Sequence, residues 1–308
     1  MSVAFLFPGQ GGQFVGMLNY CRDVSCVRAL FEEASDILKR DLWSLVEHGP
    51  IEELSLTENT QPAMLVADVA LWRMFEKSGK VNKESDIWLA GHSLGEYAAL
   101  VASGVLSFAD ALRSVCYRAA VMQDAVPKGQ GAMAAVLGLS ADEVMGVCNS
   151  LSTCGAVVEV VNFNNSSQTV IGGHHAAVEK ASVEIKRKGA KKVIFLDMSV
   201  PSHSSLMIAA KDKMRDFLET ITFFRPTYPV VHNLTADICH DHNLMKDILA
   251  EQLSSPVRWS DTIAFIQRQS VRRFVQCGPG NVMVGLLRKI PCIEIFLSSD
   301  YCPVDCIW

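Results

Sequence analysis

Short apolar runs alternate along the chain with stretches whose hydrophobic residues recur at helical spacing. The run VAFLF at residues 3–7 ends at Pro8-Gly9 and predicts a buried first strand. Residues 25–39 place their hydrophobic residues near one face and predict an amphipathic helix. Strands that alternate with such helices are typical of a mainly parallel sheet covered by helices, so we expect an α/β fold.

Further elements continue this alternation. Residues 60–78 predict a helix with Thr60 as its N-cap and Pro62 in its first turn. A strand is expected near residues 87–91, then a helix from Leu94 and another over about 107–124. The later segments PVVHNL, RFVQC and IEIFL predict strands that return to the same sheet.

The middle of the chain has a different order of elements. Within residues 131–198 the pattern predicts strand, helix, two strands joined by a turn, helix and strand, with Gly189 ending the second helix as C′. This βαββαβ order is the ferredoxin-like unit. We therefore expect a ferredoxin-like subdomain at 128–198, inserted into a larger domain made of 1–127 and 199–308.

Composition excludes several classes of protein. Hydrophobic residues make up 49% and charged residues 20%, an ordinary globular balance. The net charge of −5 argues against a nucleic-acid-binding protein, which needs a basic surface. Apolar runs are far shorter than the roughly 20 residues of a membrane span. No secretory signal pattern opens the sequence, so we expect a cytoplasmic protein.

The cysteines and histidines give no sign of a metal site. The ten cysteines include no Cys-x-x-Cys pair, and we expect reduced, mostly buried thiols. A disulfide between Cys302 and Cys306 in the tail stays open. The cluster His240-Asp241-His242 lacks a third ligand nearby, which favours a solvated turn over a metal site.

The sharpest chemical signal is GHSLG at residues 91–95, between a predicted strand and a predicted helix. In that context G-x-S-x-G is the nucleophile elbow of α/β-hydrolase-like enzymes. The glycines avoid clashes with neighbouring backbone, and the helix that follows directs its positive end at the serine. We therefore predict that Ser93 is a nucleophile and that the larger domain is an α/β-hydrolase-like catalytic core.

A serine hydroxyl needs a base to become a good nucleophile. The candidate is His203 in VPSH, in a loop after the last strand of the inserted unit. His92 is the rival, although its side chain should leave the elbow on the side opposite to Ser93. A solvated surface histidine is the alternative interpretation of His203.

The glycine-rich segment PGQGGQ follows the first strand directly. A dinucleotide-binding fingerprint fails here, because Phe14 occupies the third glycine position and no acidic residue ends a second strand at the usual distance. An oxyanion loop fits better, since glycines let a backbone N–H approach a developing alkoxide. A simple tight turn is the alternative.

Arg118 lies among apolar residues of the helix predicted at 107–124. A guanidinium in such surroundings needs an anionic partner. That partner is either a substrate carboxylate or a carboxylate of the chain in an internal salt bridge.

These motifs occur in one order: FPGQGGQ, GHSLGEYAAL, Arg118, GAMAAVLGL, VNFN, VPSH and QCGPG. The ordered set, over about residues 3–298, closely resembles the bacterial malonyl-CoA:acyl-carrier-protein transacylases, the stand-alone form of the acyltransferase domains of fatty-acid and polyketide synthases. The resemblance implies transfer of a malonyl group from malonyl-CoA to the phosphopantetheine thiol of holo acyl carrier protein. It implies no cofactor, metal, nucleic acid or membrane.

The resemblance also implies roles for particular residues. Ser93 would carry the malonyl ester and His203 would be its base, oriented by the backbone carbonyl of Gln252. Backbone N–H groups of Gln10 and Leu94 would form the oxyanion hole. The last two roles fall to side chains: Arg118 would clamp the malonyl carboxylate, and Asn162 would line the substrate pocket.

Two other functions compete with this interpretation. A serine esterase or patatin-like lipase explains Ser93 and His203 but gives Arg118 and the inserted unit no task. A non-catalytic scaffold that binds carrier protein does not explain an intact serine and histidine.

Overall fold

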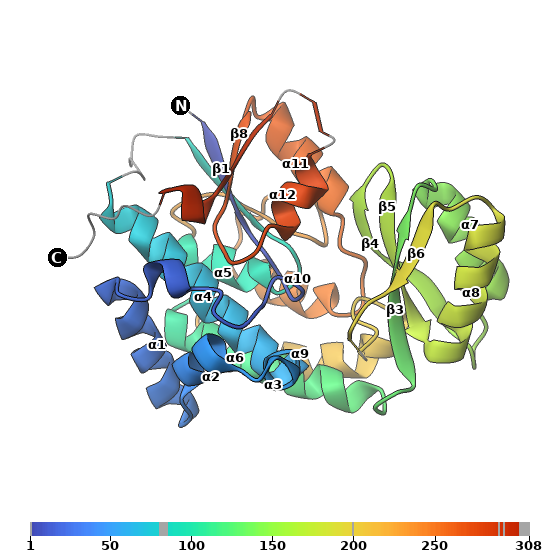
Figure 1. Ribbon diagram of the computed structural model, residues 1–308, viewed down its shortest axis with the longest axis horizontal. Coiled ribbons are helices and arrows are strands. Elements are labelled where there is room, and N and C mark those ends of the chain that lie inside the picture. Colours follow the sequence, from blue (N-terminus) through green and yellow to red (C-terminus); the bar gives the residue numbers. More distant parts are fainter. Residues whose placement is uncertain (1, 80–85, 199, 289, 292, 302–308) are drawn as a thin grey trace.

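Two β-sheets organise the chain, whose computed structural model describes residues 2–79, 86–198, 200–288, 290–291 and 293–301 (Figure 1). One is five-stranded, in the order β7-β2-β1-β8-β9, and the other is four-stranded, in the order β4-β5-β3-β6. The strands of the first sheet are β1 (Val3–Phe7), β2 (Ile87–Gly91), β7 (Val230–Val231), β8 (Arg273–Gln276) and β9 (Glu294–Leu297). Those of the second are β3 (Gly131–Leu137), β4 (Val158–Asn165), β5 (Gln168–His174) and β6 (Lys192–Phe195).

Helices cover both sheets and fill the connections between strands. Those before β3 are α1 (Ser25–Leu38), α2 (Leu42–His48), α3 (Ile51–Leu54), α4 (Thr57–Lys77), α5 (Gly95–Ala102) and α6 (Phe108–Ala125). The later ones are α7 (Ala141–Leu151), α8 (His175–Arg187), α9 (Ile208–Glu219), α10 (Leu244–Gln252), α11 (Trp259–Arg268) and α12 (Val282–Leu287).

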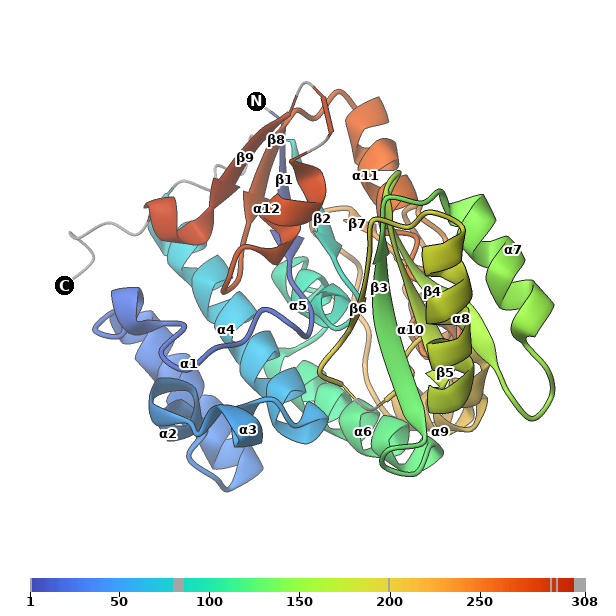
Figure 2. The same cartoon turned by 45° about the vertical axis from the view of Figure 1, so that its right-hand side comes forward.

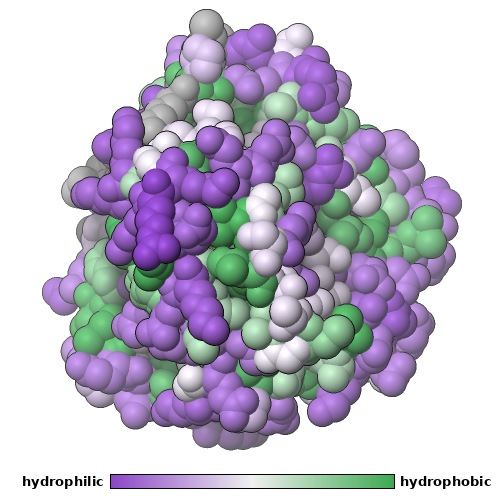
Figure 3. All heavy atoms as spheres, turned by 90° about the vertical axis from the view of Figure 1, so that its right-hand side faces the viewer, coloured by the Kyte–Doolittle hydropathy of each residue, from purple (hydrophilic) through white to green (hydrophobic). Residues whose placement is uncertain are grey.

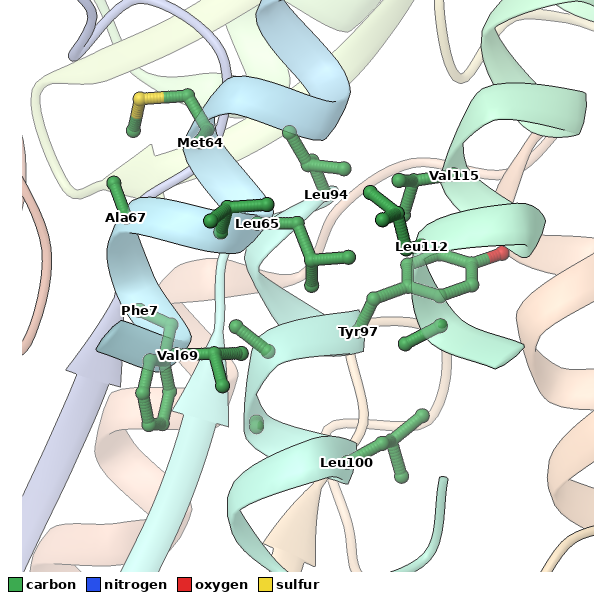
Figure 4. Close-up of a cluster of buried hydrophobic side chains, with 14 of the residues drawn as sticks. Phe7, Met64, Leu65, Ala67, Val69, Leu94, Tyr97, Leu100, Leu112 and Val115 are labelled. Carbon is green, nitrogen blue, oxygen red and sulfur yellow. The ribbon is translucent and has the colours of Figure 1, made fainter. Parts of the chain in front are cut away.

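The five-stranded sheet is buried on both faces. All of its paired strands are parallel. On β1, Phe5 and Phe7 join a core with α1, α4, α5 and α6, whereas Ala4 and Leu6 join a core with α11 and α12. Because alternate residues of β1 are buried in cores on opposite faces of the sheet, the strand is apolar throughout. Figure 4 shows side chains of α4, α5 and α6 meeting above the sheet, with Tyr97 of α5 pointing toward α6.

Parallel pairing brings the carboxyl ends of the strands to one edge, where ligands of open α/β sheets bind. Phe7 pairs with Gly91, so the glycine-rich loop after β1 lies beside the turn after β2. The next strand, β7, leads into His232 and Asn233 at the same edge, and β8 leads into Cys277. Chemistry-bearing residues distant in sequence are thereby gathered in one place.

The four-stranded sheet is antiparallel and has the strand order of a ferredoxin-like unit. One face, with Ala134 and Val136, packs on α7 and α8, and the other carries Met133 and Ala135. Figure 2 shows α8 beside this sheet. From the side of this unit, Figure 3 shows hydrophobic patches on a mostly hydrophilic surface. The predicted α/β class with a βαββαβ unit is confirmed, whereas the boundaries 1–127, 128–198 and 199–308 stay a prediction.

The predicted elements match the observed ones closely, with one error at a helix start. The helix expected from Thr60 begins earlier, at Thr57, with Leu56 as N-cap, so the prediction of Thr60 as N-cap is wrong. The Thr60 hydroxyl instead donates to the carbonyl of Leu54 at 2.5 Å. Pro62 is inside the helix and lacks an N–H for the carbonyl of Glu58. A guanidinium nitrogen of Arg40 donates to that carbonyl at 3.1 Å, which explains why the helix tolerates the proline.

Other expectations can be compared directly with the described residues. Gly189 follows α8 with φ +105°, as expected of a C′ residue. Cys21, Cys26, Cys148 and Cys277 are buried free thiols, and the tail with Cys302 and Cys306 lies outside the described residues. Among the described helices, none is long and apolar enough to cross a membrane.

Asp68 on α4 is a buried carboxyl group beneath the loop that follows β8. It is 1% exposed, and among the described residues neither of its oxygens has a hydrogen-bond partner. A Cβ at Gly278 would lie 2.3 Å from Asp68 Oδ1, so the loop packs directly on the carboxyl. Burial raises the pKa of Asp68 well above its usual value, because the charged form loses its hydration.

We expect Asp68→Asn to stabilise the protein increasingly as the pH rises. Because the pKa of Asp68 is higher in the folded than in the unfolded protein, the difference favours folding fully at pH values below the unfolded-state pKa. This contribution to stability is lost as the pH rises toward the folded-state pKa. The loss is at most about 1.4 kcal/mol per pH unit for one proton. The free energies of unfolding of the wild type and Asp68→Asn, measured with urea at pH 4 and pH 8, test this expectation. Asp23→Asn, at a side chain that is 79% exposed, is the control. An equal effect of Asp68→Asn at both pH values would contradict the prediction.

Candidate active site

Ser93 occupies a strained turn between β2 and α5. Its φ is +52°, in the left-handed region that non-glycine residues rarely adopt. A Cβ at Gly91 would lie 1.9 Å from the carbonyl carbon of Gly95, and a Cβ at Gly95 would lie 2.2 Å from the Phe7 oxygen. Only glycine fits at either position, so the local sequence forces the elbow that was predicted.

Ser93 and His203 are hydrogen-bonded to each other. Ser93 Oγ lies 2.7 Å from His203 Nε2, and His203 Nδ1 lies 2.7 Å from the backbone oxygen of Gln252. Since a carbonyl oxygen can only accept, Nδ1 carries the proton and Nε2 is the free acceptor. This tautomer is the one that can take a proton from the serine hydroxyl.

The carbonyl that orients His203 comes from the end of a helix. Gln252 is the last residue of α10, where backbone carbonyls lack a helical partner and the helix dipole is negative. The Gln252 carbonyl therefore takes the place that a carboxylate has in a Ser-His-Asp triad. Its partial negative charge favours an imidazolium, but less than a full charge would.

His203 is buried and has a strongly lowered pKa. Burial in the site and the nearby positive charge of Arg118 lower the pKa of His203 to about 3. The imidazole is therefore neutral throughout the physiological pH range. A neutral imidazole with a free Nε2 is the form that a general base requires.

His92, the rival base, points elsewhere. Its Nε2 lies 3.0 Å from Asn164 Oδ1, and its ring lies against Trp259 at 5.3 Å between centroids. A carbonyl-type oxygen accepts from Nε2, so this nitrogen carries a proton and cannot also accept one from Ser93. The geometry favours His203.

The two residues expected to supply oxyanion donors both lie at the cavity beside Ser93. Gln10 and Leu94 both line the cavity at the serine. Within the described ranges neither backbone N–H donates a hydrogen bond to another group of the chain. The N–H of Ser93 itself is engaged, because it donates to Asn233 Oδ1 at 2.6 Å. Gln10 and Leu94 thus have the donors that an oxyanion needs.

Arg118 on α6 brings a positive charge to the nucleophile. Its side chain is 2% exposed, and Nη2 lies 3.1 Å from Ser93 Oγ. Nη1 donates to Gln61 Oε1 at 2.9 Å, and Nη2 approaches Gln252 Oε1 at 3.4 Å. No carboxylate of the described part of the chain forms an ion pair with it. The geometry thus disfavours an internal salt bridge and leaves a buried cation held by neutral acceptors.

A cavity of about 440 Å³ connects these groups. Ser93, His203 and Arg118 line one side, and the apolar face of the antiparallel sheet lines the other. Asn162 of β4 also lines it, and its buried Oδ1 has no partner within the described chain. A wider cleft of about 1060 Å³ adjoins this cavity and shares Leu196 and Met198 with it.

Four supporting groups were not anticipated from the sequence. They are Gln61, Glu96, Asn233 and the side chain of Gln252, all of them buried. Glu96 adjoins the GHSLG motif, but its hydrogen-bond partners lie more than a hundred residues away. No local pattern identifies such partners.

A parallel α/β sheet with an elbow serine hydrogen-bonded to a histidine defines the class of serine-dependent acyl-transfer enzymes. The family model described as "Acyl transferase domain" matches residues 4–289. The chain belongs to the family of malonyl CoA-acyl carrier protein transacylases.

Individual relatives are similar over nearly their whole length. The malonyl CoA-acyl carrier protein transacylase of Salmonella typhimurium is 46% identical over 288 residues, 93% of this chain and 92% of the relative. The structure of the Coxiella burnetii enzyme of the same name superposes with a TM-score of 0.93 at 42% identity, covering 97% of this chain and 94% of that one. A malonyl-transacylase solved with a type II polyketide synthase acyl-carrier protein gives 0.91 at 43% identity, covering 96% and 95%. The rival expectations of a hydrolase and a scaffold are therefore wrong.

We expect a fluorophosphonate probe to label Ser93 at a nearly constant rate between pH 8 and pH 5, because the low pKa keeps His203 neutral. A histidine with the usual pKa of about 6.5 would lose about 30-fold in rate at pH 5. Arg118→Met removes the charge that lowers the pKa of His203, so labelling should begin to fall at a higher pH. Gel-based labelling measures both, with Ser93→Ala as the unlabelled control. If the labelling rate of the wild type fell with a midpoint near pH 6.5, the low pKa of His203 would be contradicted.

Proposed function

We propose that the chain transfers the malonyl group of malonyl-CoA to the phosphopantetheine thiol of acyl carrier protein, through a malonyl ester on Ser93, in fatty-acid biosynthesis. The observation that carries the proposal is the buried guanidinium of Arg118, 3.1 Å from Ser93 Oγ. A cytoplasmic location fits the free cysteine thiols, which are typical of reducing compartments.

In the first half-reaction the Ser93 oxygen attacks the thioester carbonyl, and His203 Nε2 accepts the hydroxyl proton. The tetrahedral oxyanion is held by the N–H groups of Gln10 and Leu94, and each such donor is worth about 3–4 kcal/mol. The C–S bond then breaks, and the proton on His203 passes to the sulfur of CoA. The products are malonyl-Ser93 and CoA.

In the second half-reaction the same groups act in reverse. The thiol of the phosphopantetheine arm gives its proton to His203 and attacks the ester carbonyl. The Ser93–acyl bond breaks, and the proton returns to the serine oxygen. Both steps use only groups of the chain and of the substrates, so the proposal includes no metal or cofactor.

Arg118 would select the acyl group. In the free protein its fork is held by neutral oxygens of Gln61, Ser93 and Gln252. A malonyl carboxylate is charged and can bind both guanidinium nitrogens, so it competes well against these neutral acceptors. An acetyl group offers no such oxygens. Burial makes the preference strong, because an unpaired buried charge is costly.

Asn162 and the wide cleft would receive the rest of the substrate. The unpartnered Asn162 Oδ1 can accept a hydrogen bond from a ligand in the cavity. CoA and the carrier protein present the same pantetheine arm, whose amides supply such donors. The adjoining cleft offers a path from the surface to Ser93.

Intact-mass measurement after brief incubation with malonyl-, methylmalonyl- and acetyl-CoA tests the proposal. We expect a malonyl adduct on the wild type and none on Ser93→Ala. His203→Ala should load more slowly by on the order of 10²–10⁴, because the hydroxyl has lost its base. Loading of Ser93→Ala, or loading of His203→Ala at the wild-type rate, would refute the corresponding role.

Substitutions of Arg118 test acyl selection. Arg118→Ala should lower kcat/KM for malonyl-CoA by roughly 10²–10³, the cost of about 3–5 kcal/mol for losing one buried charge partner. Acetyl transfer should be unchanged or improved. Arg118→Lys keeps the charge without the planar fork and should lie between. A parallel loss for both acyl groups, with a lower melting temperature, would instead indicate a structural role.

A further inference from the structure

Glu96 is a fully buried carboxyl group in the first turn of α5, the helix that follows the elbow. It is 0% exposed, and its two oxygens accept three hydrogen bonds. These come from His232 Nδ1 at 2.8 Å, the backbone N–H of Asn233 at 3.0 Å and Gln252 Nε2 at 2.7 Å. A buried carboxylate with three donors is well satisfied. The reaction steps described above give Glu96 no task.

The hydrogen bond to Gln252 gives Glu96 a link to the reacting groups. The side-chain amide of Gln252 also donates to the Ser93 carbonyl oxygen at 3.2 Å, and its Oε1 faces Arg118 Nη2 at 3.4 Å. Its backbone carbonyl orients His203 at 2.7 Å. One residue therefore touches the nucleophile, the base and the guanidinium.

Glu96, together with the Ser93 carbonyl oxygen, determines which way the Gln252 amide points. A carboxylate accepts only from the NH₂ end of the amide, so the oxygen end must face the guanidinium, which can only donate. Without a carboxylate at Glu96, only the longer bond to the Ser93 carbonyl, at 3.2 Å, would hold the NH₂ end, and the amide could rotate and present NH₂ to Arg118. Two donors would then face each other in a buried space.

The same arrangement balances charge without blocking the site. Arg118 is 2% exposed, and burial lowers its pKa while the charge of Glu96 raises it. The Gln252 amide separates the two ions, so Glu96 compensates the cation without forming an ion pair with it. The guanidinium remains available for a carboxylate that enters the cavity.

A second branch of contacts leads from Glu96 to the elbow. Glu96 accepts from the Asn233 backbone, and the Asn233 side chain accepts from Ser93 N at 2.6 Å and donates to the Gly91 carbonyl at 2.6 Å. Asn233 therefore braces the strained turn from both sides.

We propose that Glu96 is a positioning residue for acyl transfer, which holds Gln252 and Asn233 so that Arg118 faces the acyl group and Ser93 faces His203. The inference rests on the proposed function, because it names the support of the same site. It assigns Glu96 a role in choosing malonyl over acetyl groups although it touches neither substrate.

Glu96→Gln tests the inference, since it keeps the shape but replaces one acceptor oxygen with a donor. The single-turnover rate constant for malonyl loading should fall by on the order of 10²-fold, the effect of a small misplacement of reacting groups. Acetyl loading should fall less, because it does not use Arg118. The malonyl-to-acetyl ratio of rate constants should therefore fall. Glu47→Gln, whose carboxylate accepts from Trp43 Nε1 at 2.6 Å on α2, is the matched control and should retain the wild-type ratio.

A merely structural role predicts another result. It would lower the fraction of chain that loads, leaving both rate constants and their ratio unchanged, and that outcome would overturn the inference. If Glu96→Gln does not fold, Gln252→Met is the second test, because it keeps the backbone carbonyl that orients His203 and removes the three side-chain amide contacts, to Arg118, Ser93 and Glu96. We expect it to lower the malonyl-to-acetyl ratio, and an unchanged ratio would overturn the inference. Absence of malonyl loading in the wild type would instead refute the proposed function.

Discussion

The backbone turn at Ser93 is the constraint on which the rest of the site depends. A φ of +52° is unfavourable for serine and persists only if neighbouring groups hold it. Close packing at Gly91 and Gly95 holds the turn from the chain itself, and Asn233 holds it through two hydrogen bonds. Because Asn233 takes the Ser93 N–H, that group is not available to an oxyanion, whereas the N–H groups of Gln10 and Leu94 make no hydrogen bond within the described residues.

The second organising feature is the buried positive charge of Arg118, which contacts no counter-ion among the described residues. In the described structure the terminal nitrogens of Arg118 donate to neutral oxygens while Nε has no partner, and the charge of Arg118 contributes to the low pKa of His203. The proposed function uses both effects. A carboxylate that binds Arg118 would neutralise this charge and so make His203 a stronger base when the right acyl group is present. Binding and activation would then depend on the same guanidinium.

The sequence predicted the groups that have a local signature. GHSLG between a strand and a helix identified Ser93, and the alternation of strands and helices identified both sheets. The Gln252 carbonyl came only from family resemblance, because a backbone carbonyl has no residue-type signature. Glu96 and Asn233 were missed, since their contacts join segments more than a hundred residues apart. Thr60 was misassigned because three residues before it also adopt helical geometry.

The order of strands in the main sheet has a consequence for how the protein folds during synthesis. β1 lies between β2 and β8, so the first strand to be made is completed by residues 273–276. The antiparallel unit, by contrast, uses strands from residues 131–195 alone. Local pairing is fast and distant pairing is slow. We expect the antiparallel unit to fold during synthesis. The five-stranded sheet that carries Ser93 can be completed only when nearly the whole chain has been made.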